Sequence, residues 1–477
     1  MILNMQITED KLRTFIYSVV SELNSVSGDK AAASKGALGQ FTDVDAAVDA
    51  AEKAQRQLCA LSLEKRAEII ASIRKNAEAN AELLGKMANE ETGMGRADDK
   101  AVKNRLAARK TPGMEDIKTE AFTGDHGMTL VERAPFGVIG SIIPSTNPTG
   151  TVINNSISMI AGGNSVVFNP HPSAKACSCK TVEIVNRAVV DAGGPDNLAT
   201  AIVNPTMDSG NALMHHPKIR LLSVTGGPGI VNAAMKSQKK VIAAGPGNPP
   251  VVVDATADID NAAKSILDGA SFDNNTLCIA EKEVFAEDKI FDSLMEKLQN
   301  IGAYRISETQ LNDLMKYIIT KPGQDGKEPV VNRKLVGRTP KAILKYIGIE
   351  VPENVRLVIC EVPKDHPLVK IEQLMPVIPF VRVGSVNEAI NLAYRAERGC
   401  HHTAVMHSRN VDSLTKMARL LDTTIFVKNA PSYSGLGFDG EGFATLTIAT
   451  PTGEGLTSAK TFTRIRRCVL KDAFRIV

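Results

Sequence analysis

The chain has 477 residues, of which 43% are hydrophobic and 23% charged, and its formal net charge is +3. The near balance of charge, the 4% aromatic content and the absence of tryptophan argue against a nucleic-acid-binding surface. No apolar run approaches the ~18 residues of a membrane span, and no secretory signal pattern is visible. The seven scattered cysteines indicate a reducing environment. We expect a cytoplasmic protein of two or three domains.

Residues 5–24 form an expected amphipathic helix that stands apart from the rest of the chain. Its apolar residues recur at three- and four-residue steps, and they are Leu12, Phe15, Ile16, Val19, Val20 and Leu23. Residues 25–40 are rich in Ser, Ala and Gly and are predicted to be a flexible linker. A tethered helix of this kind either folds back on the body or docks on a partner.

From about Phe41 the chain is Ala-rich and helical as far as about Arg109. After that, short apolar β-branched runs alternate with helical segments, which predicts a parallel sheet covered on both faces. The expected strands are 137–144, 165–170, 198–203, 219–227 and 239–245. The pattern resumes at "PPVVVDAT", so a second α/β domain is expected there.

Four places along this pattern carry groups that could take part in catalysis or ligand binding. Asn147 follows a strand and lies between two prolines, where its amide could stabilise an oxyanion. A Gly turn at Thr225, Gly226 and Gly227 could face a phosphate. Cys278 lies between a helix and a strand, and Glu372 precedes an apolar run. Taken singly, each has an ordinary structural interpretation: a turn Asn, a tight turn, a buried Cys and a surface Glu.

The segment "GCHHTAVMHS" (399–408) gathers one cysteine and three histidines. Two adjacent histidines in a strand point apart, and no carboxylate or further cysteine completes a ligand set. We therefore expect no metal site.

The order of these features is more specific than any one of them. The chain from about Phe41 to Val477 resembles the aldehyde dehydrogenase superfamily, most closely the CoA-acylating aldehyde dehydrogenases of bacterial ethanolamine and 1,2-propanediol utilisation. The resemblance lies in segments such as "PSTNPTGTVINNSISMIAGGNSVVF", "AAGPGNPPVVVDATADID", "SFDNNTLCIAEKEV", "GCHHTAVMHSRN" and "TPTGEGLTSAKTFTRIRRCVL".

The resemblance implies an α/β aldehyde dehydrogenase fold with a Rossmann-like cofactor domain, a second α/β catalytic domain and a small β oligomerisation arm. The implied divisions are a targeting helix at 1–24, a linker at 25–40, an NAD-binding domain at 41–245, a catalytic domain at 246–450 and a C-terminal tail with an oligomerisation strand at 451–477. Residues 125–137 would belong to the arm.

The resemblance also assigns roles to single residues. Cys278 matches the nucleophile, and Asn147 matches the side-chain half of the oxyanion hole, with the backbone N–H of Cys278 as the other half. Glu372 matches the residue that holds the nicotinamide ribose. The other cofactor-binding positions implied are Pro144, Ser145, Asn169, His171, Thr225, Gly226 and Gly227. Asn169 and His171 stand where many relatives have a lysine on the adenosine ribose, so NADP remains possible beside NAD.

One departure from the wider superfamily bears on the reaction. Hydrolytic members carry a glutamate that activates water, whereas Ala244 or Gly245 takes that position here. The implied reaction is therefore oxidation of acetaldehyde or propionaldehyde to acyl-CoA, with coenzyme A as the acyl acceptor and no base assigned for its thiol. A butyraldehyde enzyme, a hydrolytic enzyme and an inactive shell-binding protein are the alternatives.

The partners expected from the resemblance are a short-chain aldehyde, CoA, further copies of the chain in a homodimer or homotetramer, and shell proteins. The shell proteins would bind residues 5–24 and place the enzyme inside a bacterial microcompartment. No nucleic-acid or membrane partner is expected.

Overall fold

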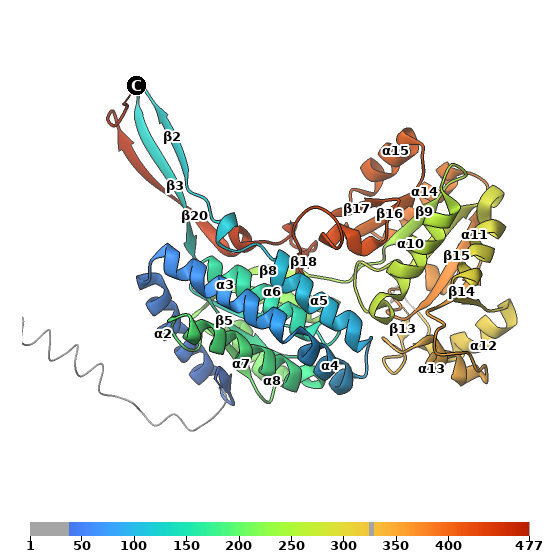
Figure 1. Ribbon diagram of the computed structural model, residues 1–477, viewed down its shortest axis with the longest axis horizontal. Coiled ribbons are helices and arrows are strands. Elements are labelled where there is room, and N and C mark those ends of the chain that lie inside the picture. Colours follow the sequence, from blue (N-terminus) through green and yellow to red (C-terminus); the bar gives the residue numbers. More distant parts are fainter. Residues whose placement is uncertain (1–37, 324–328, 477) are drawn as a thin grey trace, which may run out of the picture. The chain divides into compact units, whose positions relative to one another are not determined.

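The computed structural model describes residues 38–323 and 329–476 (Figure 1). The predicted targeting helix at 5–24, and the linker at 25–40 except its last three residues, lie outside the described residues. The described chain contains two all-parallel sheets with helices packed against them and a separate antiparallel sheet of three strands. The alternation of strands and helices expected from the sequence is confirmed.

The first parallel sheet has the strand order β1-β6-β5-β4-β7-β8. Its strands are β1 (Gln40–Phe41), β4 (Val138–Ile142), β5 (Ser165–Asn169), β6 (Ala199–Ile202), β7 (Ile219–Thr225) and β8 (Lys240–Ala244). From β4 the chain adds β5 and β6 on one side and then β7 and β8 on the other. The strand order therefore reverses between β4 and β7, and ligands of doubly wound sheets bind outside the carboxyl ends of the strands at such a point.

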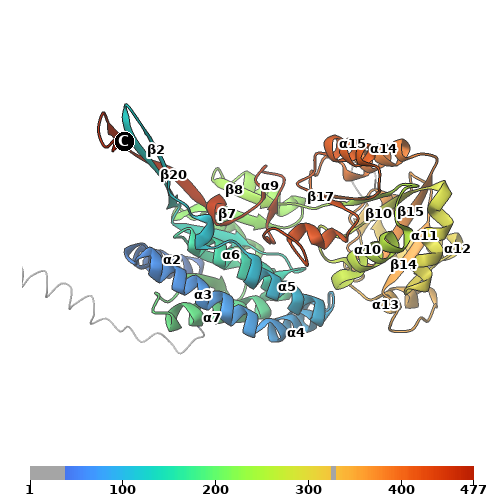
Figure 2. The same cartoon turned by 45° about the horizontal axis from the view of Figure 1, so that its top comes forward.

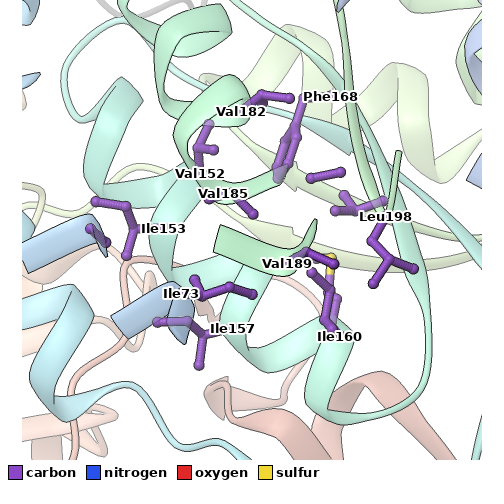
Figure 3. Close-up of a cluster of buried hydrophobic side chains, with 14 of the residues drawn as sticks. Ile73, Val152, Ile153, Ile157, Ile160, Phe168, Val182, Val185, Val189 and Leu198 are labelled. Carbon is purple, nitrogen blue, oxygen red and sulfur yellow. The ribbon is translucent and has the colours of Figure 1, made fainter. Parts of the chain in front are cut away.

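The helices that pack on this sheet are α2 (Val44–Ala60), α6 (Pro148–Ala161), α7 (Lys175–Asp191), α8 (Met207–His215) and α9 (Pro228–Met235). Outside α6 and α7 lie α3 (Leu63–Ala79), α4 (Ala81–Thr92) and α5 (Ala97–Lys110). Every residue of α6 is buried. Figure 3 shows apolar side chains of α3, α6 and α7 meeting Phe168 of β5 and Leu198. Burying such side chains contributes about 1.5–3 kcal/mol each, and it fixes α6, whose first turn begins at the predicted site residue Asn147.

The second parallel sheet has the order β11-β14-β15-β10-β9-β16-β17. Its strands are β9 (Pro250–Val253), β10 (Glu283–Glu287), β11 (Ala303–Arg305), β14 (Leu357–Glu361), β15 (Val377–Val383), β16 (Thr403–His407) and β17 (Ile425–Lys428). Its helices are α10 (Ile259–Ser271), α11 (Asp288–Asn300), α12 (Glu308–Ile318), α13 (Pro340–Leu344), α14 (Val386–Glu397) and α15 (Val411–Leu421). The step from one sheet to the other falls at residues 245–249, between β8 and β9.

The third sheet joins β2 (Glu120–Gly124), β3 (Gly127–Pro135) and β20 (Thr463–Lys471), and Figures 1 and 2 show the three strands side by side. The strand β20 pairs with β3 along its whole length, from Thr463 opposite Pro135 to Lys471 opposite Gly127. β2 was outside the arm bounds of 125–137 drawn from the sequence. All five of its residues are exposed, so it lacks the apolar alternation that signals a strand.

Two short antiparallel pairs complete the strands of the described chain: β12 (Ile319–Lys321) with β13 (Val330–Val331), and β18 (Ile448–Ala449) with β19 (Gly455–Leu456). Within the described ranges, no helix has the length and apolarity needed to span a membrane.

Candidate active site

Cys278 lies in the loop between α10 and β10, directly after a strained turn. Asp273, Asn274 and Asn275 have φ angles of 48°, 51° and 65°, so three consecutive residues with side chains adopt the left-handed conformation. Each such residue costs on the order of 1 kcal/mol, and this strain persists only where the surroundings impose it. The backbone ahead of Cys278 is therefore fixed by tertiary contacts.

Two asparagine amides hold this turn. The Asn274 amide donates to the carbonyl oxygens of Gly337 at 2.9 Å and Gly95 at 3.2 Å. The Asn275 amide donates to the carbonyls of Ala270 at 2.8 Å and Glu281 at 2.9 Å, and so joins the end of α10 to the residues after the cysteine. Both asparagines are buried, so losing either amide would leave backbone acceptors unsatisfied.

Lys282 holds the loop from its other end. This fully buried ammonium donates to Asn275 Oδ1 at 2.7 Å and to the Leu277 carbonyl at 3.0 Å. Its neighbours Glu281 and Glu283 are also buried. Burial raises the pKa of Glu281 to about 7, although the carboxylate accepts the N–H and hydroxyl of Ser432, and it raises the pKa of Glu283 well above its usual value.

A second buried charge cluster surrounds Asp273. Its Oδ2 accepts from Lys100 Nζ at 3.0 Å and from Lys103 Nζ, and its Oδ1 accepts the backbone N–H of Arg96 at 2.8 Å. Burial by itself would raise the pKa of Asp273, but the two lysines outweigh it, so the pKa is lowered and the carboxylate is ionised at neutral pH. The cluster joins α5 to the turn before Cys278.

Asn147 lies at the N-cap position of α6, yet its side chain makes no capping hydrogen bond. Its Oδ1 accepts from Lys103 Nζ, and its Nδ2 makes a long hydrogen bond of 3.4 Å to Thr146 Oγ1. A small pocket on this side of the molecule is lined by Lys100, Lys103 and Asn147 among others. The structure thus connects the predicted oxyanion amide to the predicted nucleophile through Lys103 and Asp273.

Cys278 itself is a thiol in a mostly apolar setting. Burial and, after it, the carboxylate of Glu372 raise its pKa to about 12, although the charges of Lys282 and Lys103 act in the opposite direction. Glu372 accepts the backbone N–H of Gly247 at 3.3 Å. A side chain at Gly247 would lie 2.8 Å from the Cys278 carbonyl oxygen, so Glu372, Gly247 and Cys278 are neighbours in this site.

His402 also belongs to this neighbourhood. Its Cγ would lie 2.9 Å from a Cβ placed on Gly247, which puts the ring beside the Cys278 backbone. Burial lowers the pKa of His402 to about 4, with a smaller contribution from Lys282, so the imidazole is neutral. Its Nδ1 lies 2.9 Å from Thr403 Oγ1, and its buried Nε2 has no partner among the described residues. A neutral ring nitrogen of this kind can accept a proton.

The predicted dinucleotide turn follows β7, at the point where the strand order reverses. Thr225 ends the strand, and its Oγ1 is buried with no hydrogen-bond partner in the described chain. Gly227 is the N-cap of α9, and nothing lies within 4 Å of a Cβ built on it. Pro144 and Ser145 follow the neighbouring strand β4 at the same edge of the sheet. This edge of the sheet thus offers helix N–H groups and an unpaired hydroxyl to an anionic ligand.

The two positions expected near the adenosine ribose have local partners. Asn169 ends β5 at the same edge of the sheet. It is buried, and its Oδ1 accepts a hydrogen bond from Ser209 Oγ at 2.7 Å. His171 caps a short helix, accepting the Ser173 N–H at 3.2 Å. Burial lowers the pKa of His171, and Arg333 adds to this effect.

The structure also describes the position where hydrolytic relatives carry a glutamate. Ala244 is buried at the end of β8, and a Cβ on Gly245 would lie 2.7 Å from Pro451 Cγ. A longer side chain at Gly245 would therefore displace Pro451. Across the described ranges, no group of three His, Cys, Asp or Glu residues is arranged to hold a metal ion.

Sequence reasoning proposed Cys278, Asn147 and Glu372 as site residues. It did not propose Lys103, Asp273, Lys282 and His402, which the structure places around these candidates. Charged residues in a sequence are by default assigned to the surface, because they are almost never fully buried unless paired. The run "AEKEV" after Cys278 could have signalled burial, since it places charges at the start of an otherwise apolar central strand.

Comparison with known proteins places the chain in a family. The model of the aldehyde dehydrogenase family matches residues 21–311. The chain is 50% identical over 441 residues to the acetylating acetaldehyde dehydrogenase EutE of Salmonella typhimurium, covering 92% of this chain and 94% of that protein.

Two solved structures are similarly close. One is a propionaldehyde dehydrogenase from the fucose utilisation microcompartment of Clostridium phytofermentans, with a TM-score of 0.89, 49% identity and coverage of 92% of this chain and 100% of that chain. The other is the Rhodopseudomonas palustris propionaldehyde dehydrogenase with bound CoA and an acylated cysteine, with a TM-score of 0.89, 49% identity and coverage of 92% and 99%.

The chain therefore belongs to the aldehyde dehydrogenase family. Within that family it is one of the acylating aldehyde dehydrogenases, as the sequence resemblance implied.

The position of Glu372 beside Cys278 leads to a prediction about the pKa of the Cys278 thiol. Removing its negative charge by Glu372→Gln lowers the pKa of Cys278, because the thiolate no longer faces a carboxylate. The rate of Cys278 alkylation by iodoacetamide should then rise at lower pH than in the parent protein. Peptide mass spectrometry isolates this site from the exposed Cys59 and Cys468.

Glu388→Gln is the matched control. Glu388 also accepts a glycine N–H, that of Gly384 at 3.0 Å, but it lies at an exposed position of α14. An unchanged alkylation profile in Glu372→Gln would contradict the placement of this carboxylate beside the thiol.

Proposed function

We propose that this protein oxidises a short aliphatic aldehyde to its acyl-CoA, using NAD as the electron acceptor and Cys278 as the nucleophile. The observation that carries the proposal is a half-buried cysteine beside Glu372 and a neutral histidine, with Asn147 linked to its loop through Lys103 and Asp273. Ala244 and Gly245 stand where a hydrolytic enzyme needs a carboxylate. The likeness to acetylating and propionaldehyde-oxidising relatives supports it.

The first step is attack of the Cys278 sulfur on the aldehyde carbonyl. In this proposal the nucleophile is stored protonated, because burial and the facing carboxylate of Glu372 raise the pKa of the thiol. A ligand that engages the Glu372 carboxylate reduces that repulsion, and the buried ammonium of Lys282 then favours the thiolate. In this proposal the thiol is activated when the cofactor site is filled.

The oxyanion formed by this attack needs hydrogen-bond donors to stabilise it. The Asn147 amide and the backbone N–H of Cys278 supply them, each typically worth about 3 kcal/mol. Asn147 stands at the N-terminus of α6, where the helix dipole adds positive potential. The adduct then loses a hydride, and a thioester remains on the Cys278 sulfur.

In this proposal the dinucleotide binds at the carboxyl ends of β4 and β7, where the strand order reverses. The free Thr225 hydroxyl, the open surface at Gly227 and the N-terminus of α9 would hold its phosphates, and Glu372 the nicotinamide ribose. Pro144 and Ser145 would line the nicotinamide pocket, and Asn169 and His171 would lie toward the adenosine ribose. When bound, NAD supplies the hydride acceptor.

The last step transfers the acyl group to the thiol of CoA. With Ala244 and Gly245 offering no carboxylate, water has no general base at that position, whereas a thiolate attacks a thioester readily. We assign to His402 the task of accepting the CoA proton, because its ring is neutral and its buried Nε2 has no partner among the described residues. In this role Nδ1 carries the hydrogen and donates it to Thr403 Oγ1, which leaves Nε2 as the acceptor.

Acetaldehyde and propionaldehyde are the substrates we propose, with butyraldehyde as the longer alternative. Steady-state assays of the three aldehydes, each with and without CoA and with NAD or NADP, test this assignment. We expect sustained turnover only with CoA and a single burst of reduced cofactor without it, accompanied by one acyl group on the Cys278 peptide.

The matched variant for this assay is Cys278→Ser, for which we expect activity to fall about 10³-fold or more, because the nucleophile is lost. Sustained turnover without CoA, giving free acid, would instead identify a hydrolytic enzyme. Full activity of Cys278→Ser would refute the proposed nucleophile.

The role of His402 predicts a defect in one half of the reaction. His402→Ala should slow acyl transfer to CoA by about 10²-fold, the usual contribution of a general base, and leave the burst of reduced cofactor nearly unchanged. Stopped-flow measurement of the burst, followed by quench analysis of the acyl-enzyme after CoA is added, separates the two rates. Equal slowing of both steps would indicate a structural role only.

We also propose that the antiparallel arm joins subunits into a homodimer or homotetramer. Its strands carry exposed apolar side chains, including Phe122, Ile465 and Val469, which are 59%, 58% and 64% exposed. Both outer strands, β2 and β20, offer edges in the described chain. Exposed apolar strands of this kind are usually covered by another chain.

The tethered segment at 5–24 is proposed to direct the enzyme to a microcompartment shell, which the amphipathic pattern supports. Deletion of residues 1–24 should leave activity in solution intact and abolish co-purification with shells. Quantitative blotting of purified shells, with full-length protein as reference, measures this. Equal shell association of the two proteins would contradict the proposal.

A further inference from the structure

The buried lysine Lys103 has no role in the reaction as described so far, yet it contacts the proposed oxyanion donor. Its Nζ donates to Asn147 Oδ1 and to Asp273 Oδ2. Lys103 is 5% exposed and Asp273 is fully buried, so the contact is sheltered from water. A buried ammonium needs partners of this kind to offset the loss of its hydration.

We propose that Lys103 is a positioning residue that sets the orientation of the Asn147 amide, and that it thereby presents Nδ2 to the oxygen of the aldehyde bound on Cys278. This inference rests on the proposed oxyanion role of Asn147.

The chemistry of the two groups fixes the direction of the amide. An ammonium has three donors and no acceptor, so the atom of Asn147 that faces Lys103 is its oxygen. The two Nδ2 hydrogens then lie on the opposite side of the amide. If the lysine were absent, the amide could turn over, and its oxygen would repel the developing oxyanion instead of stabilising it.

The position of Asn147 on α6 gives independent support. Asparagine at an N-cap normally accepts a hydrogen bond from the N–H of the second or third helical residue. In this helix that capping bond is absent, and the oxygen is turned to Lys103. A lysine on α5 has therefore replaced the helix itself as the partner of this oxygen, which frees the amide from the geometry of the cap.

The lysine is itself held firmly. Asp273 accepts from Lys103 and Lys100 through one oxygen and from the Arg96 N–H through the other. Burial lowers the pKa of Lys103 to about 8, against the opposing charge of Asp273, so the ammonium form prevails at neutral pH. Because Asp273 also begins the strained turn before Cys278, one carboxylate anchors both proposed halves of the oxyanion hole.

Lys100 provides a matched control. It donates to the same Asp273 oxygen at 3.0 Å, is 2% exposed, and lies one turn away on α5. However, its second contact is the Thr146 carbonyl at 3.0 Å and not the Asn147 side chain. Lys100→Met removes an equivalent buried charge from Asp273 without releasing the amide oxygen.

The test is a double-mutant cycle on the rate of the first turnover, measured as the burst of reduced cofactor under saturating aldehyde. Asn147→Ala should lower this rate by about 10²–10³-fold. Lys103→Met should lower it by about 10–100-fold in the parent protein and by at most about threefold in the Asn147→Ala background, where only the smaller effect of the Lys103 charge on the Cys278 thiolate remains. Lys100→Met should change the rate by the same factor in both backgrounds.

Lys103→Gln keeps an N–H donor without the charge, so it should recover part of the rate lost in Lys103→Met. It also replaces Lys103→Met in the cycle if that variant does not fold, as judged by circular dichroism and thermal unfolding. Equal effects of the Lys103 variant with and without Asn147 would overturn the inference while leaving the proposed function intact. An unaffected first turnover in Asn147→Ala would instead refute the oxyanion role and the inference with it.

Discussion

The buried carboxylate of Asp273 is the constraint on which the site depends. It is fully buried, it accepts from two lysines of α5 and from the Arg96 N–H, and it begins a turn in which three side-chain-bearing residues are left-handed. A turn of this kind is unstable in an isolated peptide. Removing one partner of a buried charge pair typically costs about 3–5 kcal/mol, which is comparable with the strain of about 3 kcal/mol or more in the three left-handed residues. The loop that carries Cys278 is therefore shaped by charges outside it.

A second set of buried charges fixes the other side of the same loop. Lys282 binds Asn275 and the Leu277 carbonyl, and it lies between Glu281 and Glu283, both of whose pKa values are raised by burial. These charges also act on the thiol, since Lys282 and Lys103 favour the thiolate while burial and Glu372 oppose it. The same residues that position the nucleophile thus adjust its reactivity. We propose that the ionisation of the Cys278 thiol responds to what engages Glu372.

The reaction we propose follows from the groups that surround Cys278. Asn147 lies at the start of α6, which packs on the first parallel sheet. Cys278 lies in the loop that leads into β10 of the second parallel sheet. The residues at 244 and 245 lack a carboxylate, and packing against Pro451 leaves little room for one at Gly245. His402 remains as a neutral base next to the Cys278 backbone. Acyl transfer to a thiol, and not to water, is the reaction that this arrangement favours.

The sequence by itself determined the alternation of strands and helices, the candidates Cys278, Asn147 and Glu372, and the family. Apolar periodicity reports local structure directly, and the motif segments are long enough to be specific. The tertiary structure alone decided that Lys103, Asp273, Lys282 and His402 join the site. Lys103 and Asp273 are 170 residues apart, and nothing local in either segment distinguishes a buried lysine from an exposed one. Strand β2 was missed for a related reason: its exposed residues pair through the backbone, which leaves no hydrophobic pattern in the sequence.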